Sequence, residues 1–369
     1  MTETTTNLPA IEVRDLVKRY QKSKTNAVDG VTFSVRRGEI FGLLGPNGAG
    51  KTTTIGVLIT SVIPTSGSAS ITGISVAGDP IGIKQRIAVV PQMSNLDRSL
   101  KVREILTFHA AYHSVSRKER EAKADQILDE LGLGERKNEK VNRYSGGMAQ
   151  RLMIARALMH SPDVLFLDEP TNNLDPQSRL FLWDRIRALN QQGLTILLTT
   201  HDMMEADKLC DRVAIMDHGR ILVNDTPAEL KKMIPGGNAL EIRVRLADPA
   251  DGAARERLIH ALEALPGVSK VEEVDAPAAA GSAPGPPAGA PAGPPRPGPW
   301  GSMGGPGAGA PVPEEPGIVT YRLYAETAGT LAGAAAQAVL SAGAEVRDLH
   351  VKQATLEEVF IYLTGRHLR

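Results

Sequence analysis

Residues 45–52 of this chain read Gly45-Pro46-Asn47-Gly48-Ala49-Gly50-Lys51-Thr52. They match the pattern G-x-x-x-x-G-K-[ST] at every fixed position, and in that pattern the glycines let backbone N–H groups surround phosphate oxygens. The apolar run at residues 39–44 predicts a buried strand, and residues 52–58 predict a helix whose N-terminal dipole favours an anion. The alternative, a glycine-rich turn with an incidental lysine, does not require a strand before the loop and a helix after it. The sequence therefore predicts a site for a nucleoside triphosphate.

The side chains that end this loop have separate expected tasks. Lys51 is expected to reach the β- and γ-phosphates of ATP, and the Thr52 hydroxyl is placed to coordinate Mg²⁺. We expect the whole run from Gly45 to Thr53 to line the nucleotide.

The length and charge of the chain limit its architecture and its partners. With 369 residues it is long enough for two or three domains. Lys and Arg total 42, as do Asp and Glu, so no overall field attracts nucleic acid or an anionic membrane. The single cysteine, Cys210, excludes a disulfide framework and predicts a reducing compartment, where its expected role is that of a small packed residue.

No segment of the sequence predicts membrane insertion. Residues 1–7 lack the basic and apolar regions of a signal peptide. The most apolar candidate, residues 331–343, is shorter than the roughly 18 residues that a span requires and is mostly Ala and Gly. We therefore expect a soluble, cytoplasmic chain whose contact with a membrane depends on a partner.

Short apolar runs alternate with helical patterns over residues 11–235, which predicts an α/β domain. Within this domain, residues 95–160 predict an inserted helical subdomain, because Ile105, Phe108 and Tyr112 recur at helical spacing. Residues 1–10 precede the first run and are expected to be disordered.

The composition changes abruptly at residues 276–317. This segment holds 13 of the 25 prolines, with Gly and Ala filling most of the rest, so it cannot bury a core. We expect a disordered linker. A Pro-rich docking ligand is the alternative, but no P-x-x-P pattern with flanking specificity residues stands out, and Trp300 alone does not supply one.

Two similar halves flank this linker and predict a small C-terminal accessory domain, residues 236–275 with 318–369. Alternating strands at residues 240–246 and 268–274 enclose a helix at 254–265, and strands at 318–324 and 344–351 enclose a helix at 327–340. A last helix follows at 355–363. This β-α-β and β-α-β order predicts a ferredoxin-like α+β fold that the linker interrupts.

Residues 164–169, Val-Leu-Phe-Leu-Asp-Glu, predict a buried strand that carries two adjacent carboxylates at its tip. Asp168 is suited to hold Mg²⁺, and Glu169 is suited to activate an attacking water as a general base. Strands often end in acidic residues without such a role, so this motif gains its meaning from the other motifs.

A third signal is Ser145-Gly146-Gly147. Ser145 can cap a helix over residues 149–159, and the two glycines expose backbone N–H groups, which predicts a second anion site. These motifs, in this order, resemble the ATP-binding-cassette (ABC) ATPase family, whose LSGGQ signature precedes its acidic strand. The resemblance covers residues 11–230.

The resemblance implies roles for four further residues. Tyr20 stacks on adenine, Gln92 contacts Mg²⁺ and the attacking water, and His201 contacts the γ-phosphate. Asp175 belongs to a loop that crosses a dimer interface. In isolation these are ordinary residues of a strand end or a loop.

The same resemblance makes Lys51, Glu169, Gln92 and His201 the catalytic residues. It counts Ser145, Gly146 and Gly147, with Tyr20 and Asp175, among the nucleotide contacts, and gives Mg²⁺ to Thr52, Gln92 and Asp168.

Three positions depart from the family pattern. Tyr144 and Met148 replace the leucine and glutamine of the signature, which leaves the contacts at its edges open. Asn173 replaces a common glycine before Leu174, which leaves the conformation of the crossing loop open.

Within the family, the chain resembles ATPase subunits of daunorubicin-resistance and nodulation-factor exporters, in residues 45–54, 95–97 and 355–365. That resemblance implies a homodimer with two ATP molecules, each held between Gly45–Thr52 of one subunit and Ser145–Gly147 of the other. It also implies a separate integral-membrane permease and a peripheral position on the cytoplasmic face of the cell membrane.

Two other functions stay open at this point. One is a soluble ABC ATPase that acts on ribosomes or nucleic acid, and the other is an importer ATPase with a regulatory C-terminal domain. The chain has one phosphate loop and no sustained heptads, whereas the soluble class usually carries two cassettes or a long coiled coil. We therefore expect no nucleic acid partner.

His109 and His113 have the i, i+4 spacing that can hold a metal ion. No Glu follows His109 in an H-E-x-x-H pattern. We therefore expect both side chains on a solvated helix face.

Overall fold

The computed structural model of the chain describes residues 8–234, 238–246, 252–274, 318–325 and 331–365. The chain divides into a first unit, residues 1–234 with 355–369, and a second unit, residues 235–354. The predicted linker at 276–317 and residues 1–7 lie outside the described residues, so their disorder stays a prediction. Ala10, placed in the disordered N-terminus by sequence, is instead buried and donates its N–H to the Val35 carbonyl.

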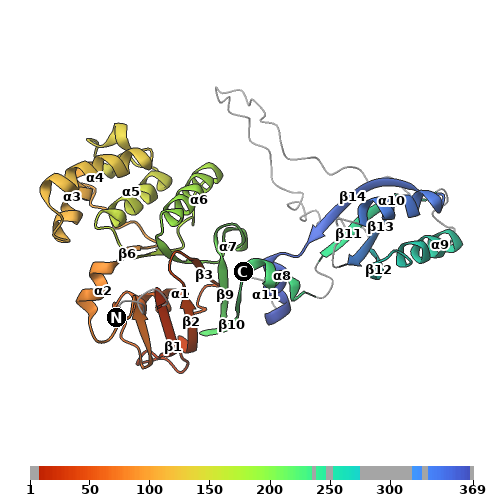
Figure 1. Ribbon diagram of the computed structural model, residues 1–369, viewed down its shortest axis with the longest axis horizontal. Coiled ribbons are helices and arrows are strands. Elements are labelled where there is room, and N and C mark those ends of the chain that lie inside the picture. The colour runs from red at the N-terminus through yellow and green to blue at the C-terminus, as the bar shows by residue number, and fades with distance from the viewer. Residues whose placement is uncertain (1–7, 235–237, 247–251, 275–317, 326–330, 366–369) are drawn as a thin grey trace, which may run out of the picture. The chain divides into compact units, whose positions relative to one another are not determined.

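A six-stranded sheet forms the centre of the first unit (Figure 1). Its strands are β3 (Ile40–Leu44), β6 (Ile87–Val90), β7 (Val164–Asp168), β8 (Thr195–Thr200), β9 (Arg212–Asp217) and β10 (Arg220–Asp225). The order is β10-β9-β3-β8-β7-β6, and every neighbouring pair is parallel except β10 and β9. Strands β3, β7 and β8 are buried along their whole length, which explains why they read as unbroken apolar runs in the sequence.

A second, antiparallel sheet completes this part of the unit. It contains β1 (Ile11–Lys18), β2 (Val28–Val35), β4 (Ser66–Ile71) and β5 (Ile74–Ser75), in the order β2-β1-β4-β5. Phe33 of β2 stacks on Phe41 of β3, with ring centroids 5.2 Å apart, and Ile55 of helix α1 (Lys51–Leu58) belongs to the same apolar core. The phosphate loop between β3 and α1 therefore starts and ends in packed elements.

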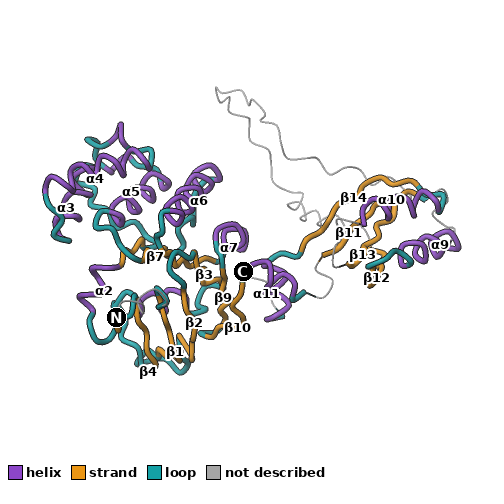
Figure 2. The backbone as a smooth tube through the Cα atoms, viewed as in Figure 1, coloured by secondary structure: helices purple, strands orange, loops and turns teal. Residues whose placement is uncertain are grey.

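Helices α3 (Val102–Tyr112), α4 (Arg117–Glu130) and α5 (Gly146–Leu158) gather at one end of the first unit, within the predicted range 95–160 (Figure 2). The buried face of α3 includes Ile105, Leu106 and Ala110. Phe108 and Tyr112, which the spacing also places on it, are 58% and 87% exposed, because α4 and α5 cover only the adjacent face. Two 3-10 turns, Gly134–Arg136 and Val141–Arg143, complete this part, whereas α2 (Pro80–Arg86) lies before it and contacts β5 and β6.

The last helix of the chain belongs to the first unit. This unit also contains α6 (Pro176–Gln191), α7 (Met203–Leu209) and α8 (Pro227–Lys232), and α11 (Leu356–Thr364) contacts both α7 and α8. Leu356, Val359 and Phe360 are buried in the core of the first unit. The sequence predicts this helix but assigns it to the accessory domain, and that assignment is wrong because its apolar face packs on the other unit.

The second unit is a four-stranded antiparallel sheet with two helices. Its elements are β11 (Asn238–Arg245), α9 (Gly252–Glu263), β12 (Val268–Val274), β13 (Ile318–Ala325), α10 (Ala332–Ser341) and β14 (Glu345–Gln353), and the strand order is β12-β13-β11-β14. Inward residues of β11 and β13, among them Leu240 and Tyr321, form one core with Leu258 of α9 and Val339 of α10.

The helices of both units are modest in length. The longest described one, α6, has 16 residues. In the described parts of the chain, no helix has the length and apolar character that crossing a bilayer requires.

Candidate functional site

The phosphate loop follows a path that only glycine permits at two positions. A Cβ atom on Gly45 would lie 2.2 Å from the Met216 carbonyl oxygen, and one on Gly50 would lie 2.4 Å from the Ala27 carbonyl oxygen. Gly50 also has φ = 104°, in the left-handed region that other residues avoid. The loop is thereby fixed beside β9, and the free N–H groups at the start of α1 lie at its end.

Lys51, the first residue of α1, is 4% exposed. Its Nζ donates to the carbonyl oxygens of Gly45 at 2.7 Å and Pro46 at 3.1 Å, and lies 3.6 Å from Glu169 Oε1. Burial lowers the pKa of Lys51, and the charge of Glu169 opposes that shift. The lysine is therefore held against the loop that it is predicted to serve.

Asp168 and Thr52 meet at the tip of β7. The Thr52 hydroxyl lies 3.3 Å from Asp168 Oδ1, and the Thr199 hydroxyl donates to the same oxygen at 2.5 Å. Gln92 lies nearby. Its Nε2 donates a hydrogen bond to Glu169, and its amide oxygen does not take part in that hydrogen bond. The three predicted metal ligands thus offer a hydroxyl, a carboxylate and an amide oxygen, the hard donors that Mg²⁺ prefers.

Glu169 has an unusual backbone and a crowded carboxylate. Its φ is 48°, and its N–H donates to Thr199. A non-glycine residue in the left-handed region is strained, and such strain persists only where neighbouring contacts hold it. The side chain is 8% exposed, and its neighbours therefore restrict its direction.

Three side chains converge on one oxygen of Glu169. Gln92 Nε2 donates to Oε2 at 3.1 Å and Asn172 Nδ2 at 3.2 Å, while His201 Nδ1 lies 3.2 Å from the same atom. A carboxylate oriented in this way, beside oxygen ligands for a metal, can accept a proton from a water molecule.

The sequence did not single out Asn172 or Thr199, although both touch the acidic pair. Each stands beside a predicted residue, Asn172 three positions after Glu169 and Thr199 two before His201. A polar residue next to a motif is a weak signal, because the strand end alone does not say which way its side chain points.

The Ser145-Gly146-Gly147 turn does start a helix. Ser145 caps α5, its hydroxyl accepting the Met148 N–H at 3.3 Å. A Cβ on Gly147 would lie 2.5 Å from the Ser178 hydroxyl on α6. A Cβ on Gly146 would lie 3.8 Å from Leu174, in the loop before α6, so both glycines face α6 and that loop.

The loop before α6 accommodates its departure from the family pattern. Asp175 caps α6, accepting the Ser178 N–H at 2.9 Å, and stays exposed. Asn173 has φ = 60°. This left-handed conformation suits glycine, and asparagine tolerates it better than most residues, which explains the substitution.

Tyr144, which stands where the family signature has leucine, lies in a partly buried environment. Its hydroxyl is buried with no hydrogen-bond partner in the described chain, and burial raises the pKa of Tyr144. The structure gives no account of Met148 in place of glutamine.

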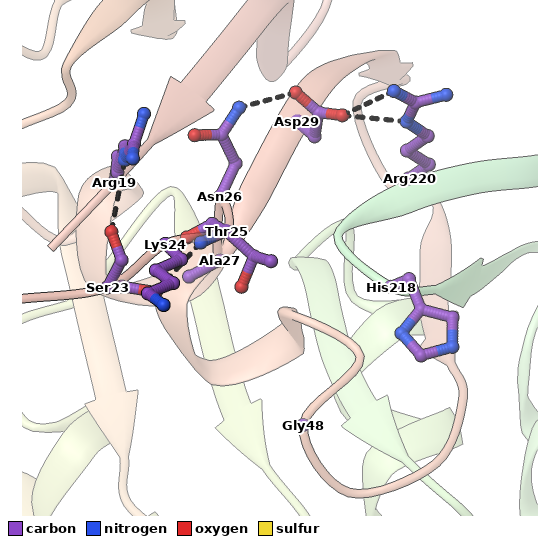
Figure 3. A pocket seen from close by; sticks show the side chains of 10 residues that line it. All are labelled: Arg19, Ser23, Lys24, Thr25, Asn26, Ala27, Asp29, Gly48, His218 and Arg220. Carbon is purple, nitrogen blue, oxygen red and sulfur yellow. Dashed lines mark hydrogen bonds and ion pairs between the residues drawn. The ribbon is translucent and has the colours of Figure 1, made fainter.

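A pocket of about 830 Å³ lies beside the phosphate loop (Figure 3). Gly48 lines it together with cationic Arg19, Lys24 and Arg220. Asn26 and Arg220 bond to Asp29 at its edge and lower the pKa of that carboxyl. The pocket is large and basic enough to receive the remainder of a nucleotide whose phosphates bind the loop.

Tyr20 does not line this pocket and lies in the loop two residues after the end of β1. It is 46% exposed, and Lys18 Nζ lies 5.1 Å from its ring centroid. The ring is accessible for stacking, and its contact with adenine stays a prediction.

Known proteins resemble this chain in sequence. Residues 28–172 match the family described as ABC transporter. The daunorubicin/doxorubicin resistance ATP-binding protein DrrA of Streptomyces peucetius is 43% identical over 252 residues, which are 68% of this chain and 75% of that protein. A daunorubicin resistance ATP-binding protein of Streptomyces coeruleorubidus is 35% identical over 96% of both chains. The Nod factor export ATP-binding protein I of Ralstonia nicotianae is 42% identical over 63% of this chain and 72% of its own.

Solved structures resemble part of this chain. An ATP-binding subunit of an ABC transporter superposes with a TM-score of 0.56 at 33% identity, covering 61% of this chain and 92% of its own. A dimeric ATP-binding cassette in a post-hydrolysis state with ADP and Pi superposes with a TM-score of 0.54 at 26% identity, covering 58% of this chain and 98% of its own.

Proposed function

Because this chain belongs to the ABC transporter family of ATP-binding proteins, we propose that it is the ATPase subunit of an exporter whose permease is a separate protein. ATP hydrolysis in transport is the activity of this family's ATP-binding domain. The observation that carries the proposal is the convergence of Lys51, Asp168, Glu169 and His201 at one end of the central sheet.

Each side chain has a role that its contacts support. Lys51 binds the β- and γ-phosphates, and the N–H groups of the loop bind the remaining phosphate oxygens. Thr52, Asp168 and Gln92 would hold Mg²⁺, which would neutralise charge on the phosphates. Glu169 orients the attacking water and takes its proton, while His201 contacts the γ-phosphate.

The second anion site leads us to propose that the chain works as a dimer. Ser145, Gly146 and Gly147 present N–H groups at the start of α5, and their described contacts run toward α6 rather than toward Lys51. In the dimer that we propose, this turn closes over the nucleotide of the other subunit, and Asp175 lies at the interface. A solved ATP-binding cassette with ADP and Pi is described as dimeric, which supports a dimer here.

Export is favoured over import and over action on nucleic acid by the names of the relatives, which describe drug resistance and Nod factor export. Phe108 and Tyr112 on α3 are exposed aromatic side chains. In this proposal they form the surface that the permease covers. Such a subunit would work as a peripheral protein on the cytoplasmic face of the cell membrane.

The second unit is proposed to be an accessory domain with a ferredoxin-like fold. Its β-α-β and β-α-β succession and its strand order β12-β13-β11-β14 support that assignment. Its extent in this proposal is residues 236–275 and 318–354, with a linker at 276–317.

Co-purification tests the proposed partnership. The tagged chain should be isolated from detergent-solubilised membranes of its own cell, and a polytopic membrane protein should be found with it by mass spectrometry. The double variant Phe108→Ala/Tyr112→Ala should lose that partner while keeping its ATPase activity. Recovery of the wild-type chain with ribosomes or nucleic acid instead would contradict the exporter assignment.

A further inference from the structure

Three half-buried histidines meet at the end of the helical subdomain, outside the nucleotide site. His109 and His113 lie one turn apart on α3 and at its end, and His160 follows α5. The His113 and His160 rings stack with centroids 3.9 Å apart, and the His109 ring lies 4.8 Å from His113 and 5.7 Å from His160. The sequence predicts His109 and His113 on a solvated face, whereas the structure shows both half-buried, because the ring of His160 lies against them.

We propose that this three-histidine cluster, His109, His113 and His160, binds a first-row transition-metal ion of the Zn²⁺ class. One nitrogen of each ring lies within 4.8 Å of one nitrogen of each other ring, and among the described residues this is the one group of three or more His, Cys or carboxylate ligands that could hold a metal ion. Imidazole is the ligand of choice for Zn²⁺, Cu²⁺ and Ni²⁺, whereas Mg²⁺ and Ca²⁺ prefer oxygen.

The surroundings of His160 leave it ready to act as a ligand. Its Nε2 lies 2.9 Å from the Ile87 carbonyl oxygen, an acceptor, so Nε2 carries the proton and Nδ1 carries the lone pair. His160 Nδ1 is buried and has no hydrogen-bond partner in the described chain. Metal-binding histidines commonly donate their other N–H to a carbonyl in this way, because that bond fixes the tautomer and the ring orientation.

The three rings are also held in the neutral form that coordinates a metal. Burial and the proximity of His113 lower the pKa of His109 to about 4, and burial lowers the pKa values of His113 and His160 as well. Two cations approach the cluster and would oppose a bound ion. Arg156 is engaged by the side chain and carbonyl of Asn95, and Lys123 by the Ser161 hydroxyl, so both have acceptors outside the cluster.

The observed stack must open when an ion binds. Lone pairs of stacked rings lie in parallel planes and do not meet, whereas three nitrogens on one tetrahedral Zn²⁺ are about 3.3 Å apart. Binding therefore requires the ring of His113, the C-cap residue of α3, to rotate about its side-chain torsions toward the other two rings. Three protein ligands then leave the fourth position of the ion for water or another ligand.

A bound ion would connect three elements that are otherwise distant in sequence. It would join α3 to the end of α5, and through Ile87 to the start of β6 in the central sheet (Figure 1). The inference does not depend on the proposed transport function.

Metal titration of the full-length chain tests this inference. After removal of metal by a chelator, Zn²⁺ should be titrated against a chromophoric indicator, and Co²⁺ should be added as a spectroscopic probe. We expect one equivalent to bind and Co²⁺ to give the intense visible bands of a tetrahedral site. His113→Gln should weaken Zn²⁺ binding at least about 10-fold, as loss of one ligand.

Two matched variants assign the site. His260→Gln removes an exposed histidine of the second unit, and His201→Gln removes the histidine beside Glu169. Both should keep wild-type Zn²⁺ affinity. If His201→Gln weakens binding and His113→Gln does not, the ion belongs to the nucleotide site and the inference is overturned.

X-ray absorption of the Zn²⁺-loaded wild-type chain needs no variant, so it serves even if a histidine substitution unfolds the protein. Scattering from three imidazoles is expected. A first shell made mainly of oxygen, or the absence of saturable binding, would overturn the inference.

Discussion

Lys51 and Glu169 form a buried ion pair, with Nζ 3.6 Å from Oε1 and side chains that are 5% and 8% exposed. The pair joins the phosphate loop to the residue that we propose as the general base. Each charge compensates the other in a place where an unpaired charge is costly. A change at either position therefore acts on binding, on catalysis and on the local structure together.

Lys51→Ala should reduce ATP affinity by at least about 10-fold, because a charged contact with the phosphates is worth about 1.5–3 kcal/mol. Fluorescence titration with a labelled ATP analogue measures it. Lys118→Ala removes an exposed lysine of α4 and should leave the affinity unchanged. Equal affinities of the wild type and Lys51→Ala would exclude the phosphate role of Lys51.

The trans role of the Ser145 turn predicts complementation. Ser145→Arg should block the anion site at the start of α5, and Lys51→Ala should disable the phosphate loop. A mixed dimer places both lesions in one composite site and leaves the other intact. Mixing the two inactive chains should therefore restore part of the ATPase activity, and no recovery in cross-linked mixed dimers would argue that the turn serves its own chain.

Glu205 predicts a pH dependence of stability. It is 1% exposed and accepts hydrogen bonds from Thr171 at 2.7 Å and Trp183 at 3.2 Å, yet burial and the nearby Asp202 raise its pKa. A carboxyl whose pKa is raised in the folded state destabilises the fold above that pKa, and the penalty disappears as pH falls below the unfolded value.

Glu205→Gln keeps the acceptor oxygen without the charge, so it should raise Tm at pH 8 by about 2 °C or more, roughly 1 kcal/mol for a domain of this size. The gain should shrink toward pH 4.5. Cys210 lies near Glu205, but burial raises its thiol pKa, so the thiol stays neutral and does not add to this pH dependence. Glu135→Gln, an exposed change, is the control. If the gain in Tm does not depend on pH, the ionised Glu205 carboxylate is not the group that destabilises the fold.

The packing of α11 predicts a large effect far from the nucleotide. Phe360 is 2% exposed, so Phe360→Ala should destabilise the first unit by about 3–5 kcal/mol and lower its Tm by about 6 °C or more. Tyr362 is 58% exposed, and Tyr362→Ala should change Tm by little. Similar Tm values for the two variants would place the helix outside that core.

The sequence was sufficient for the features that short segments determine. The phosphate loop, the apolar strands β3 and β7 and the Ser145 cap of α5 depend on neighbouring residues, and the structure contains each of them. The predicted oxygen ligands Thr52 and Asp168 meet because parallel strands end at one edge of a sheet.

Long-range packing explains what the sequence did not reveal. The apolar stripe of α11 requires a covering surface but does not identify it, so the helix was assigned to the wrong unit. The i, i+4 pair His109 and His113 was visible, whereas His160 reaches it from the turn that follows α5.

In the function that we propose, Glu169 activates the water that hydrolyses ATP within a dimer. Glu169→Gln keeps the size and the acceptor oxygen of the side chain but removes its basicity, so turnover should nearly stop while ATP and Mg²⁺ still bind. Light scattering of this variant with MgATP measures the outcome directly. We predict a particle of twice the 39.4 kDa chain mass that retains ATP, whereas the wild type returns to the single-chain mass after hydrolysis. A variant that stays at the single-chain mass with ATP bound, or that hydrolyses ATP at the wild-type rate, would contradict the claim.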